Sequence, residues 1–250
     1  MLGLVQNKGD NMDKNTKELI EHITTSLLFD ETILGSEGLS SSVWDKYLYL
    51  GYKSIVEKGA YLLRIGDCLD GFYLTKKGKI ESIFLGRDGI VKLFLVTGEG
   101  CLYGEQFIFH RQPGLFDGLV VEDAELYFFS KDTIYNIMKN DFEICLFIMK
   151  TLAIKSRMLA VQVEDMSLRN NLQKVCRILY TFCCIEEKKG RTEDTIVLRL
   201  SHQDIANMLA SHRVTVTNNL AKLKKQGILD YRYEKIIIKD KNRLKMIAFE

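Results

Sequence analysis

The chain has 250 residues, of which 46% are apolar and 27% charged, values typical of a globular protein with a sizeable core. No apolar run reaches the roughly 18 residues that a membrane span needs. The N-terminal segment also lacks the apolar centre of a secretory signal, so we expect a cytoplasmic protein. The net charge of +2 conceals an asymmetry: residues 1–168 carry 18 Lys/Arg against 24 Asp/Glu, and residues 169–250 carry 17 against 9. Unless this is chance, the C-terminal third faces a polyanion.

The cysteines and histidines do not indicate a metal site. The six cysteines contain no C-x-x-C pair and no zinc-binding spacing, and the four histidines are scattered along the chain. In a cytosolic protein such cysteines are mostly buried apolar side chains. The adjacent Cys183 and Cys184 either form a redox-active pair or lie on a helix face; we place them on a helix face and expect no metal.

The N-terminal residues predict two helices. Residues 13–29 carry apolar side chains at helical spacing after a possible N-cap at Asp13 or Asn15. A Gly/Ser-rich break follows at 35–42, and then a short aromatic helix that contains Trp44.

Residues 52–130 have the texture of a β domain. The β-rich runs, punctuated by glycines, are SIVEKG, YLLRIG, GFYLTKKGKIESIFLGRDG, IVKLFLVTGEG, LYGEQFIF, GLVVED and ELYFFS. Short strands with glycine turns are typical of a β-sandwich or barrel. The sequence Gly86-Arg87-Asp88-Gly89 predicts a hairpin between two of them.

From residue 141 the pattern becomes helical, and a mostly apolar set of positions recurs in steps of three and four. They are Ile144, Phe147, Thr151, Ile154, Met158, Val161, Asp165 and Leu168. A helix that packs into its own domain would show a wider apolar stripe, so this narrow one favours a parallel dimer seam. A polar hinge follows at 167–171, and a second helix runs from Leu172 to Cys184.

Residues 200–229 predict two short helices joined by a tight turn. Ser201 and Asp204 form a variant of the capping box at the start of the first helix. Gly227 ends the second helix as a C′ glycine, and the short break between the helices lies at 210–211. Two helices with this offset are the helix-turn-helix arrangement. The following runs ILDYRY and KIIIK predict a basic hairpin, the wing.

The second of these helices presents an exposed polar face. Arg213 and Thr217, like Val214 and Asn218, are four residues apart and therefore stack on one side. Arginine can bond guanine with two hydrogen bonds, and asparagine can do so with adenine. We expect phosphate contacts from Ser201, His202, Gln203 and Thr215, and base-edge contacts from His212, Arg213, Thr217 and Asn218. The sequence thus predicts binding to double-stranded DNA.

The order of these parts resembles the CRP/FNR family of bacterial regulators over nearly the whole chain. The segments YLLRIGD and Gly98 to Gly104-Glu105 are similar to the glycine framework of the family's β-roll, and HRVTVTNNLAKLKKQGIL to its recognition helix. The resemblance implies an α+β protein: a jelly-roll-like β-roll (1–140), a dimerisation helix (141–168) and a winged helix-turn-helix (169–250). It also implies a homodimer on a palindromic operator, with RNA polymerase as a partner.

The β-roll departs from the cyclic-AMP binders of that family. Gly104-Glu105 is present, but Leu115 and Phe116 stand where an Arg-Ser pair would grip the cyclic phosphate, and the only other basic residue of the motif is Arg111. Cyclic AMP is therefore disfavoured. An iron–sulfur cluster is disfavoured because the first cysteine is Cys68, and no haem ligand can be assigned.

The run HRVTVT resembles the halorespiration regulators of the family, which sense chlorinated phenols. Phe84, Phe94, Phe107 and Phe109 either hold such an aromatic effector or form ordinary core. A small organic effector is expected to contact Gly104, Glu105, Phe107, Met158, Val161 and Gln162. By favouring one of two pre-existing arrangements, it would reposition the recognition helices.

Two other functions compete with an effector-gated regulator. A cupin-like β-barrel metalloenzyme would need several His and carboxylate ligands on adjacent strands, whereas only His110 lies in the β-rich region. A DNA-binding protein with a vestigial pocket would act without any effector. The first alternative would make the chain an enzyme, which we do not expect.

Overall fold

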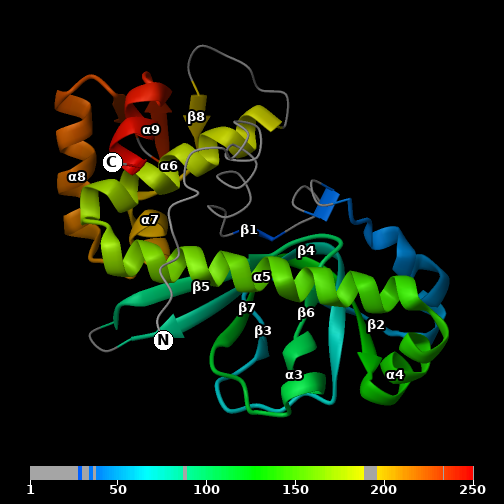
Figure 1. The fold of residues 1–250 in the computed structure, drawn as a ribbon. Helices are drawn as coiled ribbons and strands as arrows, with labels where there is room; N and C mark the ends of the chain where they lie inside the picture. The colour runs from blue at the N-terminus through cyan, green and yellow to red at the C-terminus, as the bar shows by residue number, and fades with distance from the viewer. Residues whose placement is uncertain are drawn as a thin grey trace, which may run out of the picture.

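The structure is a computed structural model that describes residues 28–29, 34–35, 38–86, 89–188, 196–232 and 234–249. Its N-terminal sheet contains β1 (Leu28–Phe29), β2 (Tyr52–Val56), β3 (Tyr61–Leu63), β4 (Gly71–Leu85), β5 (Val91–Thr97), β6 (Leu102–Tyr103) and β7 (Asp117–Ser130). The helices η1 (Ser41–Leu50, of 3₁₀ type), α3 (Glu105–His110) and α4 (Lys131–Asn140) accompany it. The long helix α5 (Phe142–Leu168) lies across the sheet and leads to the C-terminal helices (Figure 1).

The strands form one sheet in the order β1-β5-β4-β7-β2, with β3 on β7 and β6 on β4. The β1–β5 pair is parallel, and the other pairs are antiparallel. Within the described residues β1 and β2 end the strand path without pairing to each other, so the sheet is not a closed barrel. The predicted hairpin joins β4 to β5, where Leu85 pairs with Val91.

The core under α5 is aromatic. Trp44 of η1 is fully buried and lies 5.3–6.2 Å, between ring centroids, from Phe72, Phe129 and Phe147. These residues come from η1, β4, β7 and α5, so the short aromatic helix predicted around Trp44 joins the sheet to the long helix. Burial of such large side chains contributes much of the stability of a domain.

Two predicted elements differ in the structure. The helix predicted at 13–29 lies outside the described residues except for Leu28–Phe29, which form β1. The run LYGEQFIF was predicted as a strand, but only Leu102–Tyr103 are extended. Gly104 takes a left-handed φ of 92°, which turns the chain into α3.

The dimer seam predicted on the long helix is wrong for most of its residues. Ile144, Phe147, Thr151, Ile154 and Met158 are between 0% and 5% exposed in the single chain, and the four apolar ones belong to the core that contains Trp44. Because the sheet of the same chain covers this stripe, it cannot face a partner. The predicted position Val161 is half-buried, and Leu168 is 76% exposed.

A different stripe of α5 is open to solvent. Phe142, Met149, Leu159, Val163 and Met166 are 37–72% exposed. Together with Cys145, Leu152 and Ser156 they recur in strict steps of three and four residues, which is heptad spacing. An exposed apolar stripe of this length marks an interaction surface.

The C-terminal part begins with α6 (Asn171–Lys188), which packs closely against α9 (Lys241–Phe249). Between them lie β8 (Ile196–Leu198), α7 (His202–Leu209), α8 (Arg213–Lys225), β9 (Leu229–Arg232) and β10 (Lys235–Ile238). The three strands pair antiparallel in the order β8-β10-β9. The predicted helix-turn-helix and wing are therefore confirmed.

An ion-pair cluster fixes the junction between α5 and α6. Asp165 accepts contacts from Arg177 Nη1 at 3.1 Å and from Arg169 Nε at 3.2 Å, and Arg177 is 5% exposed. The ring of Phe249 lies 5.2 Å from the Arg177 guanidinium. Asp165 is thus a junction residue and not part of a dimer seam, and the C-terminus takes part in the junction.

The C-terminal part also packs on the sheet. Leu93 of β5 is buried in the apolar core formed by α6, α7 and α8, and Ile83 and Val96 pack against that core. Lys92 Nζ donates to the Met208 carbonyl, in the last turn of α7, at 2.6 Å. Burial lowers the pKa of Lys92 to about 8. Strand β5 is therefore shared by the two parts of the chain.

Candidate functional site

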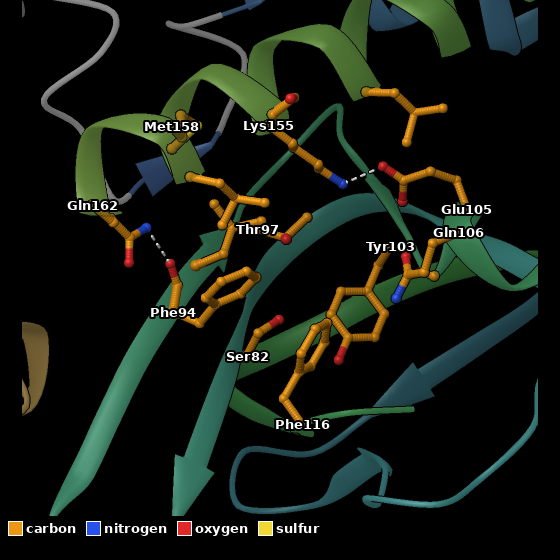
Figure 2. Close-up of a pocket in the computed structure, with 15 residues that line it drawn as sticks. Ser82, Phe94, Thr97, Tyr103, Glu105, Gln106, Phe116, Lys155, Met158 and Gln162 are labelled. Atoms are coloured by element: carbon orange, nitrogen blue, oxygen red, sulfur yellow. Dashed lines mark hydrogen bonds and ion pairs between the residues drawn. The ribbon is translucent and has the colours of Figure 1, made fainter. Parts of the chain in front are cut away.

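A cavity of about 270 Å³ lies between the sheet and α5 (Figure 2). Its lining residues are Ser82, Phe94, Leu95, Thr97, Tyr103, Gly104, Glu105, Gln106, Phe116, Leu152, Lys155, Ser156, Met158, Leu159 and Gln162. A dry cavity of about 150 Å³ is large enough to hold benzene. The space therefore suits a single substituted ring.

Lys155 supplies the cavity with a cation that the sequence analysis missed. Its Nζ contacts Glu105 Oε1 at 2.5 Å and donates to the Leu102 carbonyl at 2.9 Å (Figure 2). The Glu105 side chain is 1% exposed and the Lys155 side chain 16%. Arg111, the only basic residue expected here, is exposed and does not line the cavity. Lys155 escaped notice because it belongs to α5, about 50 residues beyond the glycine motif.

Phe94 connects the cavity wall with the strand that contacts α7. Ser82 pairs with Leu95 but Ile83 pairs with Leu93, so Phe94 is an extra residue in β5, a β-bulge. Its ring packs against Phe116 with centroids 5.4 Å apart. Its carbonyl accepts a hydrogen bond from Gln162 Nε2 at 2.8 Å (Figure 2). The bulge thus aims an aromatic ring into the cavity.

The structure brings together four of the six residues predicted to contact an effector: Gly104, Glu105, Met158 and Gln162. Val161 does not line the cavity. Phe107 packs instead into the apolar core beneath it, so its ring is ordinary core.

The predicted aromatic set divides in a similar way. Phe84 belongs to the ring cluster of Phe94 and Phe116, with centroids 5.5 and 5.8 Å from theirs. Phe109 is 43% exposed. Phe116, which was noted only as an unsuitable phosphate ligand, is part of the cavity wall.

The second half of the site is the outer face of α8. Arg213, Val214, Asn218 and His212 are exposed, while Val216, Leu220 and Leu223 are fully buried against the neighbouring helices. Asn219 is 6% exposed and donates from Nδ2 to the Thr215 carbonyl at 2.9 Å, which explains a polar residue on the buried face.

The predicted start of α7 and the predicted turn between α7 and α8 are both present in the structure. Ser201 Oγ accepts from the Asp204 amide at 3.1 Å, and Asp204 Oδ2 accepts from the Ser201 amide at 2.8 Å, so the predicted capping box is confirmed. Ala210 has φ 50° and ψ 49°, a left-handed conformation that is unfavourable for a residue with a Cβ.

A groove runs between the start of α7, the start of α8 and the wing. It is lined by Leu200, Ser201, His202, Gln203, Arg213, Tyr231, Arg232, Glu234, Lys235 and Ile236. Three of these residues are cations and one is an acid. The predicted contacts Ser201, His202, Gln203 and Arg213 lie here, while Thr215 and Thr217 are on α8, both half-buried.

Comparisons with known proteins match both parts of the chain. Residues 54–141 match the family model of a cyclic nucleotide-binding domain, and residues 173–247 match that of a Crp-like helix-turn-helix domain. The chain belongs to the CRP/FNR family of transcription regulators. The two matches together support an effector-responsive, DNA-binding transcription regulator of the CRP/FNR type.

Individual relatives and solved structures are similar to this chain over most of their length. The anaerobic regulatory protein of Bacillus subtilis (strain 168) is 24% identical over 198 residues, which are 78% of this chain and 82% of that protein. The structure titled OCPA complexed CprK is 25% identical with a TM-score of 0.65, over 80% of this chain and 92% of that one. A CooA mutant from Carboxydothermus hydrogenoformans, 18% identical, shares the fold with a TM-score of 0.70, over 83% and 94% of the two chains.

The family assignment replaces the cupin-like alternative, since the matched relatives are transcription regulators and not enzymes. In the described part of the chain, no three His, Cys, Asp or Glu side chains gather into a candidate metal site. Nor is any helix there long and apolar enough to cross a membrane. Cys183 and Cys184 are buried on α6, and burial raises the pKa of Cys183 to about 12.

Proposed function

We propose that this regulator is a homodimer whose affinity for a palindromic operator is set by a compact, weakly acidic aromatic effector in the cavity. We infer this class of effector from the cavity lining, which combines the aromatic rings of Phe94, Tyr103 and Phe116 with the ammonium of Lys155. A phenolate or carboxylate would accept a charge-assisted hydrogen bond from that ammonium. The similar structure of CprK complexed with OCPA supports the binding of an effector by this regulator.

Cyclic AMP remains disfavoured in this proposal. Leu115 is 74% exposed and Phe116 is an aromatic wall, so the positions where an Arg-Ser pair would grip a cyclic phosphate supply no cation. The one cation among the residues that line the cavity is Lys155, which offers a point charge and not the bidentate fork of an arginine. The proposal includes neither an iron–sulfur cluster nor a haem, because the sequence offers no ligand set for them.

The dimer would form through the exposed stripe of α5. Leu152, Ser156 and Leu159 belong both to that stripe and to the cavity wall. A second α5 packed there would lie beside the effector. Occupancy of the cavity would then alter the dimer contact directly, and α5 continues into the junction with α6.

A second route to the DNA-binding part runs through β5. Phe94 faces the cavity, while the neighbouring Leu93 and Lys92 contact the core and the last turn of α7. Displacement of the bulge by an effector would move these contacts. The effector must stabilise one arrangement more than the other, because equal affinity for both changes nothing.

On the DNA, Arg213, Val214 and Asn218 would contact base edges, with the Val214 side chain suited to a thymine methyl group. Ser201, Gln203, Arg232 and Lys235 would contact phosphates from the groove. The bound regulator would then act on RNA polymerase, as the family resemblance implies.

Selection from a random pool of duplexes tests the DNA part of the proposal. We expect an inverted repeat with half-sites about one helical turn apart. Recovery of no motif, or of a single unrepeated half-site, would contradict the proposal that the protein binds its operator as a dimer.

A thermal-shift screen of phenols, aromatic acids and nucleotides tests the effector class, because a ligand that binds the folded state raises its stability. Phenols or aromatic acids should raise the unfolding temperature, and Lys155→Met together with Glu105→Gln should remove their advantage over neutral isosteres. The paired substitution avoids a buried carboxylate without a partner. A hit list of nucleotides alone would contradict the proposal.

A further inference from the structure

One half-buried histidine connects α7, α8 and strand β9 of the wing. His202 is the first residue of α7, and its Nδ1 lies 2.9 Å from Thr217 Oγ1 on α8. The edge of its ring meets Tyr231 of β9, with centroids 5.1 Å apart and planes at 79°. The sequence predicts a phosphate contact for His202 and a base-edge contact for Thr217. In the structure these two side chains contact each other.

The hydrogen atoms in this contact can be assigned by counting. The Thr217 hydroxyl has one hydrogen and donates it to the Arg213 carbonyl, 2.9 Å away. It must therefore accept from His202, whose Nδ1 carries a hydrogen. Burial first, and then the Arg213 charge, lower the pKa of His202, which favours the neutral ring. The relay runs from His202 through Thr217 to the Arg213 backbone.

This relay fixes the orientation of α8 on α7 and the wing. Arg213, Val214 and Asn218 lie around Thr217 on the exposed surface of the helix. Successive residues of an α-helix are about 100° apart, so a small rotation of α8 would both break the contact and turn these side chains away from their bases. The Thr217 hydroxyl, which already donates its hydrogen within α8, has little left for a base.

We propose that His202 is a positioning residue for sequence reading, which acts through Thr217 on the base-contacting face of α8 and does not itself contact DNA. This inference deepens the proposed function and rests on it. It reassigns both residues from direct contacts to the support of Arg213, Val214 and Asn218.

The roles of positioning and phosphate contact predict different patterns of loss. Loss of a phosphate contact weakens binding to every duplex alike. Loss of positioning weakens binding to the selected operator and leaves a scrambled duplex unchanged. His202→Ala should therefore reduce operator affinity by at least roughly threefold, the effect of one ordinary hydrogen bond, without a change on scrambled DNA. Gln203→Ala, at the neighbouring groove position, should weaken both.

Two conservative substitutions of His202 make the test specific. The amide nitrogen of asparagine can occupy the place of Nδ1, whereas that of glutamine lies nearer the place of Nε2. His202→Asn should restore operator affinity and His202→Gln should not. Thr217→Val, which removes the hydroxyl at nearly constant volume, should add no further loss to His202→Ala in a double-mutant cycle.

The measurement is fluorescence anisotropy on the operator selected by the wild-type protein and on its scrambled form. An equal loss on both duplexes for His202→Ala, additive losses in the cycle, or equal behaviour of the Asn and Gln variants would overturn the proposal. Failure of the wild-type protein to select any operator would instead count against the proposed function, so the two failures are distinguishable.

Discussion

At the scale of single residues, the side chains that matter most here lie where two elements meet. Lys155 reaches from the long helix to Glu105, and His202 reaches from α7 to Thr217. Neither pair is close in sequence, and no short motif contains either pair. Residue types and spacing could identify the polar face of α8, because all of its members lie on one helix. They could not show which of those members are already engaged.

Ala210 offers a test of backbone strain in the turn. A left-handed alanine is less stable than a left-handed glycine by about 1 kcal/mol, so Ala210→Gly should stabilise the protein by up to about that amount. The reverse change at Gly227, which has φ 73° and open space around its Cα, should destabilise it by a similar amount. Urea unfolding measures both. No gain for Ala210→Gly together with a loss for Gly227→Ala would show that the αL turn at Ala210 is relaxed.

Arg213 should determine sequence discrimination. Its side chain is exposed at the start of α8, where base edges are within reach in this family of folds. Arg213→Ala should cost roughly 1–3 kcal/mol on the selected operator and little on random DNA. Lys225→Ala, at the far end of the helix, should weaken both duplexes alike and reduce the salt dependence by about one ion.

Anisotropy on operator and scrambled duplex at two salt concentrations separates these outcomes. If Arg213→Ala loses affinity equally on both duplexes, Arg213 contacts phosphate. Base discrimination would then lie with His212, Val214 or Asn218.

At the scale of elements, the periodicity of the long helix correctly indicated its existence and extent but not which stripe faces outward. Two stripes of α5 have heptad spacing. The one with Ile144, Ile154 and Met158 is the more apolar and packs on the sheet of its own chain. The stripe with Met149 and Val163 remains open. A long amphipathic helix that serves both a domain core and a dimer has two apolar faces, and sequence spacing alone does not say which is which.

Val163 tests the corrected dimer face. It is 62% exposed in the single chain, so a charge there costs the monomer little, whereas two glutamates facing each other in a seam would be desolvated and repel. Val163→Glu should sediment as a folded monomer at micromolar concentration. Arg157→Glu, exposed on the same helix but outside the stripe, should remain a dimer. A dimeric Val163→Glu protein would place the interface elsewhere.

Strand β5 should transmit changes in the cavity to α7. Phe94→Ala enlarges the cavity and also removes the ring of the bulge, so amide hydrogen exchange should accelerate at residues 202–210. Phe116→Ala enlarges the same cavity from outside β5 and should leave that segment nearly unchanged. Equal effects of the two variants would indicate general loosening of the domain and would rule out β5 as a specific route.

At the scale of the whole molecule, the domain with the cavity and the DNA-binding part are joined by helix α5 and share strand β5 (Figure 1). The order of the parts, the capping box at Ser201 and the wing were all predictable, since each depends on local sequence. The cavity was only partly predictable. Gly104, Glu105 and Phe116 lie in or near one sequence motif, whereas Lys155 belongs to the long helix α5. The packing of Leu93 in the DNA-binding core is a tertiary contact that no local pattern encodes.

If the cavity governs DNA binding, its occupancy must change the affinity of the regulator for its operator. The dissociation constant of the wild-type protein for its selected operator should be determined with and without the strongest aromatic acid or phenol from the thermal-shift screen. We predict that the two constants differ by at least about fivefold, the lower end of typical allosteric coupling. Equal constants at a saturating concentration of that compound would contradict the claim.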